Sequence, residues 1–335
     1  MSPQPRAALT DPSGRLAESG AHVFHRATGD GVTLRLAVWR PAGPPGGTVL
    51  LLQGRTEFLE KFIPLVTWLR DAGVCVLALD WRGQGGSERL LADPYKGHVH
   101  HFDAYLRDLD VLIAEADTLP GPRLVVGQSM GGHIALRGLA ERPAWAGAAV
   151  LAAPMVGLRL PLLPRRAARA WAARALRRGR ATDYAPKQGP RVRAQAVFRG
   201  NPLTSDPRAF AWTRGLLRRH PVLGLGGVTW GWIAAALESN RGLRRRATAR
   251  RVRVPVTILL GARDAVVDNA PARALAARLP RAAVAAIPRA RHELLAEAPA
   301  VRRRVAAGIE ARALEAGLSF APARPIWTYK GEASS

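Results

Sequence analysis

The residues that most constrain the fold are Gly127-Gln128-Ser129-Met130-Gly131, a Gly-x-Ser-x-Gly sequence between two apolar runs. The run before it, residues 124–126, is rich in β-branched residues, and the run after it, residues 134–136, is typical of a helix. A strand that turns sharply into a helix at this motif exposes the serine oxygen, and the glycines allow the close packing that such a turn needs. We therefore predict that Ser129 is a nucleophile and that the backbone N–H of Met130 points toward the reacting centre.

Strands and helices are predicted in alternation along most of the chain. An N-terminal hairpin is expected from His22–Arg26 and Thr33–Trp39, joined by the turn-forming residues 28–31. After the Pro- and Gly-rich residues 41–47, apolar strands are expected at Thr48–Leu52, Val74–Leu79, Arg123–Val126, Ala148–Ala152, Val256–Leu260 and Ala283–Ile287. Helices are expected at Glu60–Asp71, Ala104–Leu119, after Ser129, Ala270–Leu279 and Pro299–Ala316. Continuous apolar strands separated by helices predict an α/β fold with a mostly parallel sheet covered on both faces.

The alternation stops at Pro154 and resumes at Val254. Between these points lie basic helical stretches such as Arg165–Arg178, several prolines and the Gly-rich run Leu223–Trp232. We expect residues 155–251 to be an inserted helical lid that forms one wall of a substrate pocket. Residues 20–154 and 252–316 would then form the core, and residues 1–19 and 317–335 would be tails, the C-terminal one loosely ordered.

The net charge of +25 is concentrated in the inserted segment, residues 155–251. This segment holds 22 basic and 3 acidic side chains, a net charge of +19, which leaves +6 for the rest of the chain. Two interpretations stay open: arginines that decorate solvated helix faces, or a surface that docks transiently at an anionic membrane. No helix-turn-helix, zinc-finger or RNA-binding strand motif accompanies the arginines, so nucleic acid is not expected as a partner.

The apolar runs of the chain are short. Residues 1–20 are polar, without the apolar run of a secretory signal, and no stretch is long and apolar enough to predict a membrane span. We expect a cytoplasmic protein, peripheral to the inner face of the membrane if the arginines bind lipid. The single cysteine, Cys75, excludes a disulfide framework and is expected to pack as a small hydrophobe in a strand.

A serine nucleophile needs a histidine that takes its proton and an acid that orients the histidine. In chains that carry the serine on this kind of turn, the acid and then the histidine follow it. Three histidines follow Ser129, namely His133, His220 and His292. Only His292 comes after the sheet resumes, in a turn that follows a strand, and we therefore predict it as the base.

The acid is expected in a loop just past the carboxyl end of a strand. Asp264 stands directly after the strand predicted at Val256–Leu260, and Asp268, four residues on, is its competitor. We choose Asp264 because backbone geometry is fixed near a strand end. Asp268 is expected to cap the helix that follows it.

The oxyanion of an acyl-transfer reaction needs two backbone donors, one from the residue after the nucleophile and one from a loop after an early strand. Met130 supplies the first. Gly54 lets the chain turn after Thr48–Leu52, so that the N–H of Arg55 is predicted to point inward as the second. We expect the side chains of Arg55 and Glu57 to make a structural contact with one another.

Three other clusters receive structural interpretations. His98, His100 and His101 lack a carboxylate at the spacing that would complete a metal site, so we expect packing. The Gly-rich residues Asp80–Ser87 lack a Walker lysine and are expected to form a tight loop. Three tryptophans of the inserted segment are predicted either to line an acyl pocket or to form the core of the lid, and the choice stays open; they are Trp212, Trp230 and Trp232.

Six short stretches together resemble the α/β-hydrolase superfamily, in particular its lysophospholipase and monoacylglycerol-lipase-like group, also described as serine aminopeptidase-like. They are Gln53–Phe58, Asp80–Gly85, Gly97–Val99, Gly127–Gly132, Gly261–Asp264 and His292–Glu293, within a resemblance that covers residues 20–316. The resemblance implies a triad of Ser129, Asp264 and His292, an oxyanion hole from the Arg55 and Met130 backbone, and a variable lid between the sixth and seventh strands. Many relatives begin the oxyanion loop with His-Gly, whereas this chain has Gln53-Gly54, as bacterial lysophospholipase-like members do.

We therefore expect a serine hydrolase that needs no cofactor and no metal and that cleaves esters of monoacyl lipids, either lysophospholipid or monoglyceride. A serine aminopeptidase or a small-molecule carboxylesterase is the first alternative. Acidic residues in the inserted segment that hold a substrate amine would favour the peptidase, and Asp183, Asp206 and Glu238 are few for that role. A non-catalytic binding protein on a hydrolase scaffold is the alternative from another class, and the intact triad speaks against it.

Overall fold

The centre of the molecule is an eight-stranded sheet in the order β1-β2-β4-β3-β5-β6-β7-β8. The computed structural model describes residues 7–142, 144–159, 165–321 and 325–329. β2 runs antiparallel to β1 and β4, and every other neighbouring pair is parallel, which confirms the mostly parallel sheet. The strands are β1 His22–Ala27, β2 Thr33–Trp39, β3 Thr48–Leu52, β4 Cys75–Leu79, β5 Arg123–Gln128, β6 Ala148–Ala152, β7 Val256–Gly261 and β8 Ala282–Ile287.

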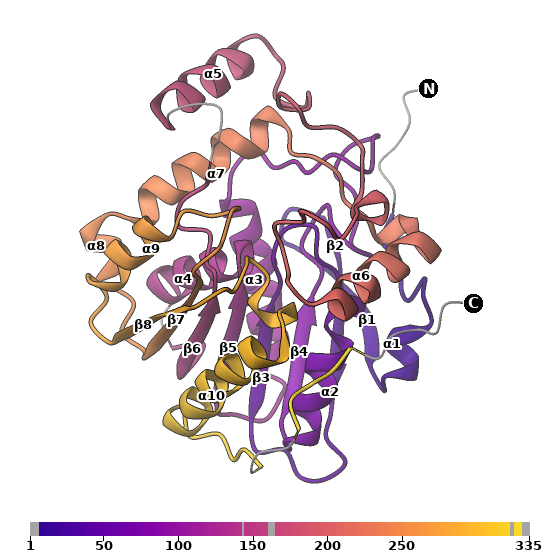
Figure 1. The fold of residues 1–335 in the computed structure, drawn as a ribbon, viewed down its shortest axis with the longest axis vertical. Coiled ribbons are helices and arrows are strands. Elements are labelled where there is room, and N and C mark those ends of the chain that lie inside the picture. The colour runs from indigo at the N-terminus through magenta and orange to yellow at the C-terminus, as the bar shows by residue number, and fades with distance from the viewer. Residues whose placement is uncertain (1–6, 143, 160–164, 322–324, 330–335) are drawn as a thin grey trace.

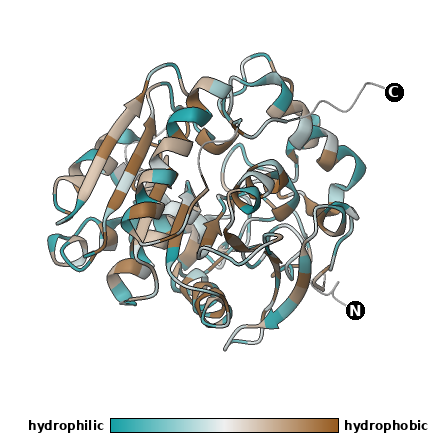
Figure 2. Ribbon diagram, turned by 90° about the horizontal axis from the view of Figure 1, so that it is seen from below, coloured by the Kyte–Doolittle hydropathy of each residue, from teal (hydrophilic) through white to brown (hydrophobic). Residues whose placement is uncertain are grey.

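The central strands are apolar along their whole length because both of their faces are covered. Every residue of β3, β4 and β6 is buried, Cys75 included. α2 and α10 cover one face, and α3 and α4 cover the other (Figure 1). Most helices carry both hydrophobic and hydrophilic residues (Figure 2), as expected for helices with one face on the sheet. The helices of the core are α1 Arg15–Glu18, α2 Ile63–Asp71, α3 Asp103–Ala116, α4 Met130–Glu141, α9 Asn269–Ala276 and α10 Pro299–Glu315.

The helix predicted to begin at Glu60 begins three residues later, at Ile63. Residues Leu59–Phe62 form a 3₁₀ turn, and the α-helix starts at Ile63 with Pro64 in its first turn. Proline suits that position because it has no N–H to donate and its φ is already helical. Within the described ranges, no helix is both long and apolar enough to span a membrane.

The inserted segment, residues 155–251, lies between β6 and β7 in the chain. Its described part contains α5 Arg165–Arg177, α6 Pro207–Arg219, α7 Trp230–Leu243 and α8 Arg246–Ala249. α5 and α7 lie beyond one end of the sheet, at the top of Figure 1. α5 packs on α7 and buries only alanines, Ala168, Ala172 and Ala175.

The prediction of a loosely ordered C-terminal tail is wrong for its described residues. Trp327 and Tyr329 are almost fully buried, and both donate hydrogen bonds to the carbonyl of Leu295, at 3.0 and 3.3 Å. The ring of Trp327 also lies 5.2 Å from that of Trp68 on α2. Large aromatic side chains gain free energy when they are buried, and this holds the tail to the core. At the other end of the chain, Leu16 on α1 is likewise fully buried.

Candidate active site

Ser129 lies at the sharp turn between β5 and α4, as predicted. Its φ of 51° and ψ of −113° are strained values for a residue with a side chain. The turn holds because the Ser129 N–H donates to the carbonyl of Ala152 at 2.9 Å, and the Ser129 carbonyl accepts from the N–H of Met155, also at 2.9 Å. A Cβ at position 131 would collide with the carbonyl of Leu52, so that glycine is required for α4 to approach β3.

His292 and Asp264 form a hydrogen-bonded chain with Ser129. The Nε2 atom of His292 lies 2.9 Å from Ser129 Oγ, and its Nδ1 atom lies 2.7 Å from Asp264 Oδ2. The other Asp264 oxygen accepts from the N–H groups of Val266 and Val267, which fixes the carboxylate. His292 and Asp264 are buried, whereas Ser129 is partly exposed.

The loops after β7 and β8 bring these two side chains together. Asp264 follows the end of β7, and His292 lies in the loop after β8. The loops touch at Gly261, where a Cβ would collide with the carbonyl of Arg291. Asp268, the competing acid, accepts a hydrogen bond from the N–H of Ala270 at 3.0 Å and caps α9, which confirms the role expected for it.

The loop after β3 lies against Ser129. A Cβ at Gly54 would stand 3.2 Å from the Cβ of Ser129, so Arg55 follows directly beside the serine. Among the described residues, none accepts a hydrogen bond from the backbone N–H of Arg55 or of Met130. Both groups are therefore available as donors to a bound ligand.

The expected contact between Arg55 and Glu57 is wrong. Arg55 Nη1 instead donates to the carbonyl of Gly226, in the inserted segment, at 2.9 Å. Glu57 turns inward, and its Oε2 accepts the N–H of Gly54 at 2.5 Å. The carboxylate thus fixes the loop after β3 through a backbone N–H and does not pair with the guanidinium of Arg55.

A buried ionic network behind the site was not predicted. Lys61 Nζ lies 2.5 Å from Glu57 and 2.8 Å from Glu293, and Arg193 lies 2.7 Å from Glu293. Gln128 also donates to Glu57 at 2.5 Å. Burial opposes ionisation of Glu293, but Arg193 and Lys61 outweigh it and hold the pKa of that carboxyl well below its usual range. The network joins the loop after β3, the residue before Ser129 and the residue after His292.

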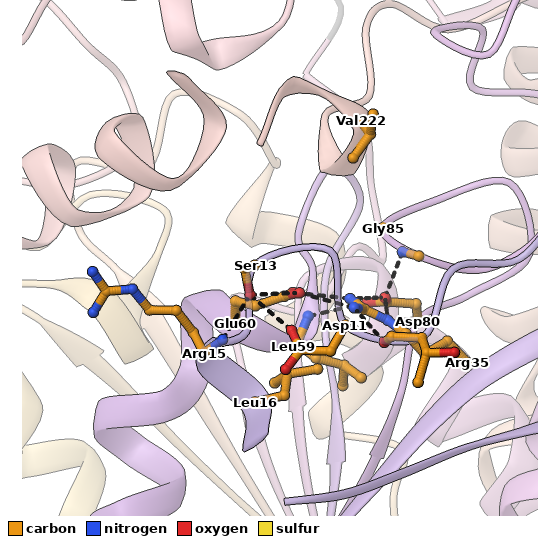
Figure 3. A network of polar contacts seen from close by, with 12 residues as sticks. Asp11, Ser13, Arg15, Leu16, Arg35, Leu59, Glu60, Asp80, Gly85 and Val222 are labelled. Carbon is orange, nitrogen blue, oxygen red and sulfur yellow. Dashed lines mark hydrogen bonds and ion pairs between the residues drawn. The ribbon is translucent and has the colours of Figure 1, made fainter. Parts of the chain in front are cut away.

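A second ionic cluster contacts the loop after β3. The guanidinium of Arg35, fully buried, lies between the carboxylates of Glu60 and Asp80, with 2.8 Å hydrogen bonds to each (Figure 3). Asp80 in turn accepts hydrogen bonds from Gln53 Nε2 at 2.6 Å and from the N–H of Leu59 at 3.1 Å. The predicted tight loop after β4 therefore anchors both ends of the loop after β3.

A cavity of about 950 Å³ opens onto Ser129 and His292. Most residues that line it belong to the inserted segment, among them Trp230 and Trp232. Trp212 lies elsewhere and donates to the carbonyl of Lys61 at 3.2 Å. The two alternatives for the three tryptophans therefore both apply. Trp230 and Trp232 line the pocket, and Trp212 packs between the inserted segment and the core.

Of the three clustered histidines, only His98 is packed between core and inserted segment; His100 and His101 are exposed, so the expected packing is wrong for these two. His98 Nδ1 lies 2.8 Å from Thr229 Oγ1, and its Nε2 lies 3.4 Å from His100. Burial, with the charges of His100 and Lys96, lowers the pKa of His98 to about 4. In the part of the chain that the structure describes, no three metal-binding side chains come together.

The fold and the site geometry together define an α/β hydrolase. The chain belongs to the family described as serine aminopeptidase, S33, whose model matches residues 43–299.

Curated relatives and solved structures agree with this assignment. The chain is 30% identical over 259 residues to the probable lysophospholipase L2 of Haemophilus influenzae, a match covering 77% of this chain and 80% of that protein. It is 34% identical over 226 residues to lysophospholipase L2 of Escherichia coli, covering 66% of this chain and 64% of that protein. The monoacylglycerol lipase structure from Paleococcus ferrophilus superposes with a TM-score of 0.66 at 21% identity, covering 84% of this chain and 99% of that one, and this likeness concerns the fold.

Proposed function

We propose that the protein is a serine hydrolase that cleaves carboxylic esters of monoacyl lipids through an acyl-enzyme on Ser129. The hydrogen-bonded chain from Ser129 through His292 to Asp264, open to the pocket at the serine, carries this proposal. His292 takes the serine proton as Ser129 Oγ attacks the ester carbonyl, and gives it to the leaving alcohol. Water then attacks the acyl-enzyme with His292 again as base, and releases the fatty acid.

The tetrahedral intermediates of both steps carry a negative oxygen. The N–H groups of Arg55 and Met130 would stabilise it, and each such donor contributes roughly 3 kcal/mol to the stability of the transition state. Asp264 accepts from Nδ1 of His292 and so keeps Nε2 free to accept the serine proton.

The pocket supports a lipid substrate. Its walls include Leu158, Leu225, Val228, Trp230 and Ile233, an apolar surface suited to an acyl chain. The names of two relatives, probable lysophospholipase L2 and monoglyceride lipase, refer to monoacyl lipids as substrates. The inserted segment supplies most of this wall, and we assign it the role of a lid.

The aminopeptidase alternative lacks an acid for the substrate amine. Glu57 and Glu293 line the pocket but are already engaged by Lys61 and Arg193. The acidic residues of the inserted segment are paired with arginines and do not line the pocket; they are Asp183, Asp206 and Glu238. An ester is therefore favoured over an aminoacyl amide.

Labelling with a fluorophosphonate probe tests the mechanism. We expect the probe to label the wild-type protein, Ser129→Ala to abolish the labelling, and His292→Ala nearly to abolish it. Full labelling of Ser129→Ala, or none of the wild type, would favour a non-catalytic binding protein. Hydrolysis of an acyl-ester series from short to long, with an aminoacyl amide alongside, tests the substrate class, and preference for the amide would favour the peptidase.

The outer face of α5 supports docking at an anionic membrane. The exposed side chains of α5 include Arg166, Arg169, Arg174, Arg177 and Trp171, and the tryptophan is 52% exposed. A helix with arginines and an exposed tryptophan on one face is typical of peripheral membrane binding. Co-sedimentation with vesicles should increase with their content of anionic lipid and decrease with salt, and no such dependence would disprove the docking.

A further inference from the structure

Arg55 is a cation in the pocket, and among the described residues no carboxylate forms an ion pair with it. Its backbone lies next to Ser129, and its side chain lines the cavity. One guanidinium N–H donates to the carbonyl of Gly226, and the guanidinium carbon lies 5.7 Å from the centre of the Trp232 ring. Tyr105 and the cation Arg193 are titratable neighbours of its guanidinium.

Three other arginines that are mostly shielded from water pair with carboxylates, whereas Arg89, also buried, donates to backbone carbonyls as Arg55 does. Arg35 lies between two carboxylates, Arg193 pairs with Glu293, and Arg302 pairs with Asp206 at 3.0 Å. Taking a guanidinium out of water without an anion is unfavourable, which is why such partners are the rule. Burial lowers the pKa of Arg55 to about 10, so that it stays charged at neutral pH.

The pocket leaves this cation available to a ligand. Its two carboxylates, Glu57 and Glu293, are held by Lys61 and Arg193, and neither pairs with Arg55. A guanidinium has five N–H donors, and its planar fork binds two oxygens of a phosphate at once. Lys187 and Arg191 also line the cavity and add to its positive potential.

Resting on the proposed ester hydrolysis at Ser129, we propose that the Arg55 side chain binds the phosphate of the substrate head group, so that the enzyme prefers lysophospholipids to monoglycerides. Only the glycerol unit separates the ester carbonyl from the phosphate in a lysophospholipid. A residue that places its backbone N–H at the ester oxygen and its guanidinium along the same wall spans this short distance. Arg55 would then determine specificity with its side chain and stabilise the oxyanion with its backbone.

The test compares two soluble substrates with the same medium-length acyl chain, a lysophosphatidylglycerol and a monoacylglycerol, both kept below their micelle concentrations. We expect the wild type to have the higher kcat/KM for the phosphate-bearing ester. Arg55→Met should lower the ratio of the two kcat/KM values roughly tenfold to hundredfold, mainly through the KM of the lysophospholipid, because a hydrogen bond to a charged group is lost. Arg55→Lys should retain part of the preference, and Arg250→Met, an exposed arginine outside the pocket, controls for the loss of one positive charge.

An unchanged ratio in Arg55→Met would overturn the proposal, as would an equal loss on both substrates, which would mean that only the backbone of Arg55 acts. If the variant fails to fold, competition in the wild type decides. Glycerol 3-phosphate should then inhibit ester hydrolysis at far lower concentration than glycerol, and equal inhibition would disprove the phosphate site. Failure of the proposed function looks different, because neither ester would be hydrolysed and Ser129 would not react with a fluorophosphonate.

Discussion

The core and the inserted segment contribute different things to the site. The core places Ser129 and Asp264 after the buried strands β5 and β7, and His292 in the loop after the edge strand β8, each within hydrogen-bond distance of the next. The inserted segment provides most of the pocket wall and most of the positive charge. Under the proposed function, the reaction chemistry would depend on a rigid sheet, whereas the choice of substrate would depend on helices and loops added beyond its edge.

The inserted segment is itself divided. Residues 193–206 are held to the loop that carries His292: Thr204 Oγ1 donates to the carbonyl of Ala296 at 2.6 Å, and Arg291 donates to the carbonyl of Asn201 at 2.8 Å. α5 buries only alanines against α7, with long charged side chains on its outer face. If the inserted segment moves as a lid, we therefore expect α5 to move more readily than residues 193–206.

The largest expected effect comes from the base. His292→Ala should lower kcat on the order of a millionfold, because residues of a triad act as a unit. The loss should be equal for a short ester and for a monoacyl lipid, since all three triad side chains belong to the core. Steady-state kinetics with both substrates measures it, and His220→Ala, a histidine of the inserted segment, is the matched control. A comparable loss in His220→Ala would break the comparison between the two regions.

The acid gives the next largest effect. Asp264→Asn should lower kcat about ten-thousandfold, because an amide no longer keeps His292 in the tautomer that accepts the serine proton. Asp268→Asn is the control, since asparagine is as good a helix cap as aspartate. If the two variants lose activity to the same extent, the choice between these carboxylates is wrong.

The strands and the three interacting side chains were predictable because their signals are local. A run of apolar residues predicts a strand, and the loop after a strand predicts which polar side chain faces the site, as at Asp264 and His292. The Gly-x-Ser-x-Gly turn is equally local as a sequence signal, although the contact that requires Gly131 is with the distant carbonyl of Leu52.

What could not be predicted depends on residues far apart in the sequence. Lys61 meets Glu293, and Trp327 donates to Leu295, only once the sheet has formed. Arg55 shows the limit most clearly: an acidic neighbour two positions away suggested a local ion pair, but its partner is a carbonyl 171 positions away. A local pattern carries no information about which distant backbone a long side chain reaches.

Removal of Lys61 sharpens the comparison through stability. Lys61→Met should lower the free energy of unfolding by about 3–5 kcal/mol, because Glu57 and Glu293 would remain buried without their shared cation. Urea denaturation measures this, and adding Glu57→Gln should restore part of the loss. Lys96→Met, which removes a cation 5.3 Å from the Tyr184 ring, should cost only about 0.5–1 kcal/mol. A loss that small in Lys61→Met would show that the network does not hold the loop after β3.

The smallest effect concerns His133, which links the two regions. Its Nδ1 lies 3.0 Å from the carbonyl of Met155, so Nδ1 carries the proton, and its Nε2 accepts the hydroxyl of Ser239 on α7 at 2.7 Å. Burial, with Arg137 nearby, lowers the pKa of His133 to about 3 in the folded protein. Below its ordinary value of 6.5, the unfolded chain therefore binds a proton that the folded protein does not.

The sign follows directly: stability is lost as the pH falls, by about 1.4 kcal/mol per pH unit for this group. His133→Gln should flatten the dependence of the unfolding free energy by that amount between about pH 6 and pH 4, whatever it costs at neutral pH. Denaturation at a series of pH values measures the slope. His101→Gln is the control, because that side chain is exposed and should leave the slope unchanged. An unaltered slope in His133→Gln would mean that the contact between α4 and α7 opens to water, and that the inserted segment is less firmly joined to the core than its hydrogen bonds indicate.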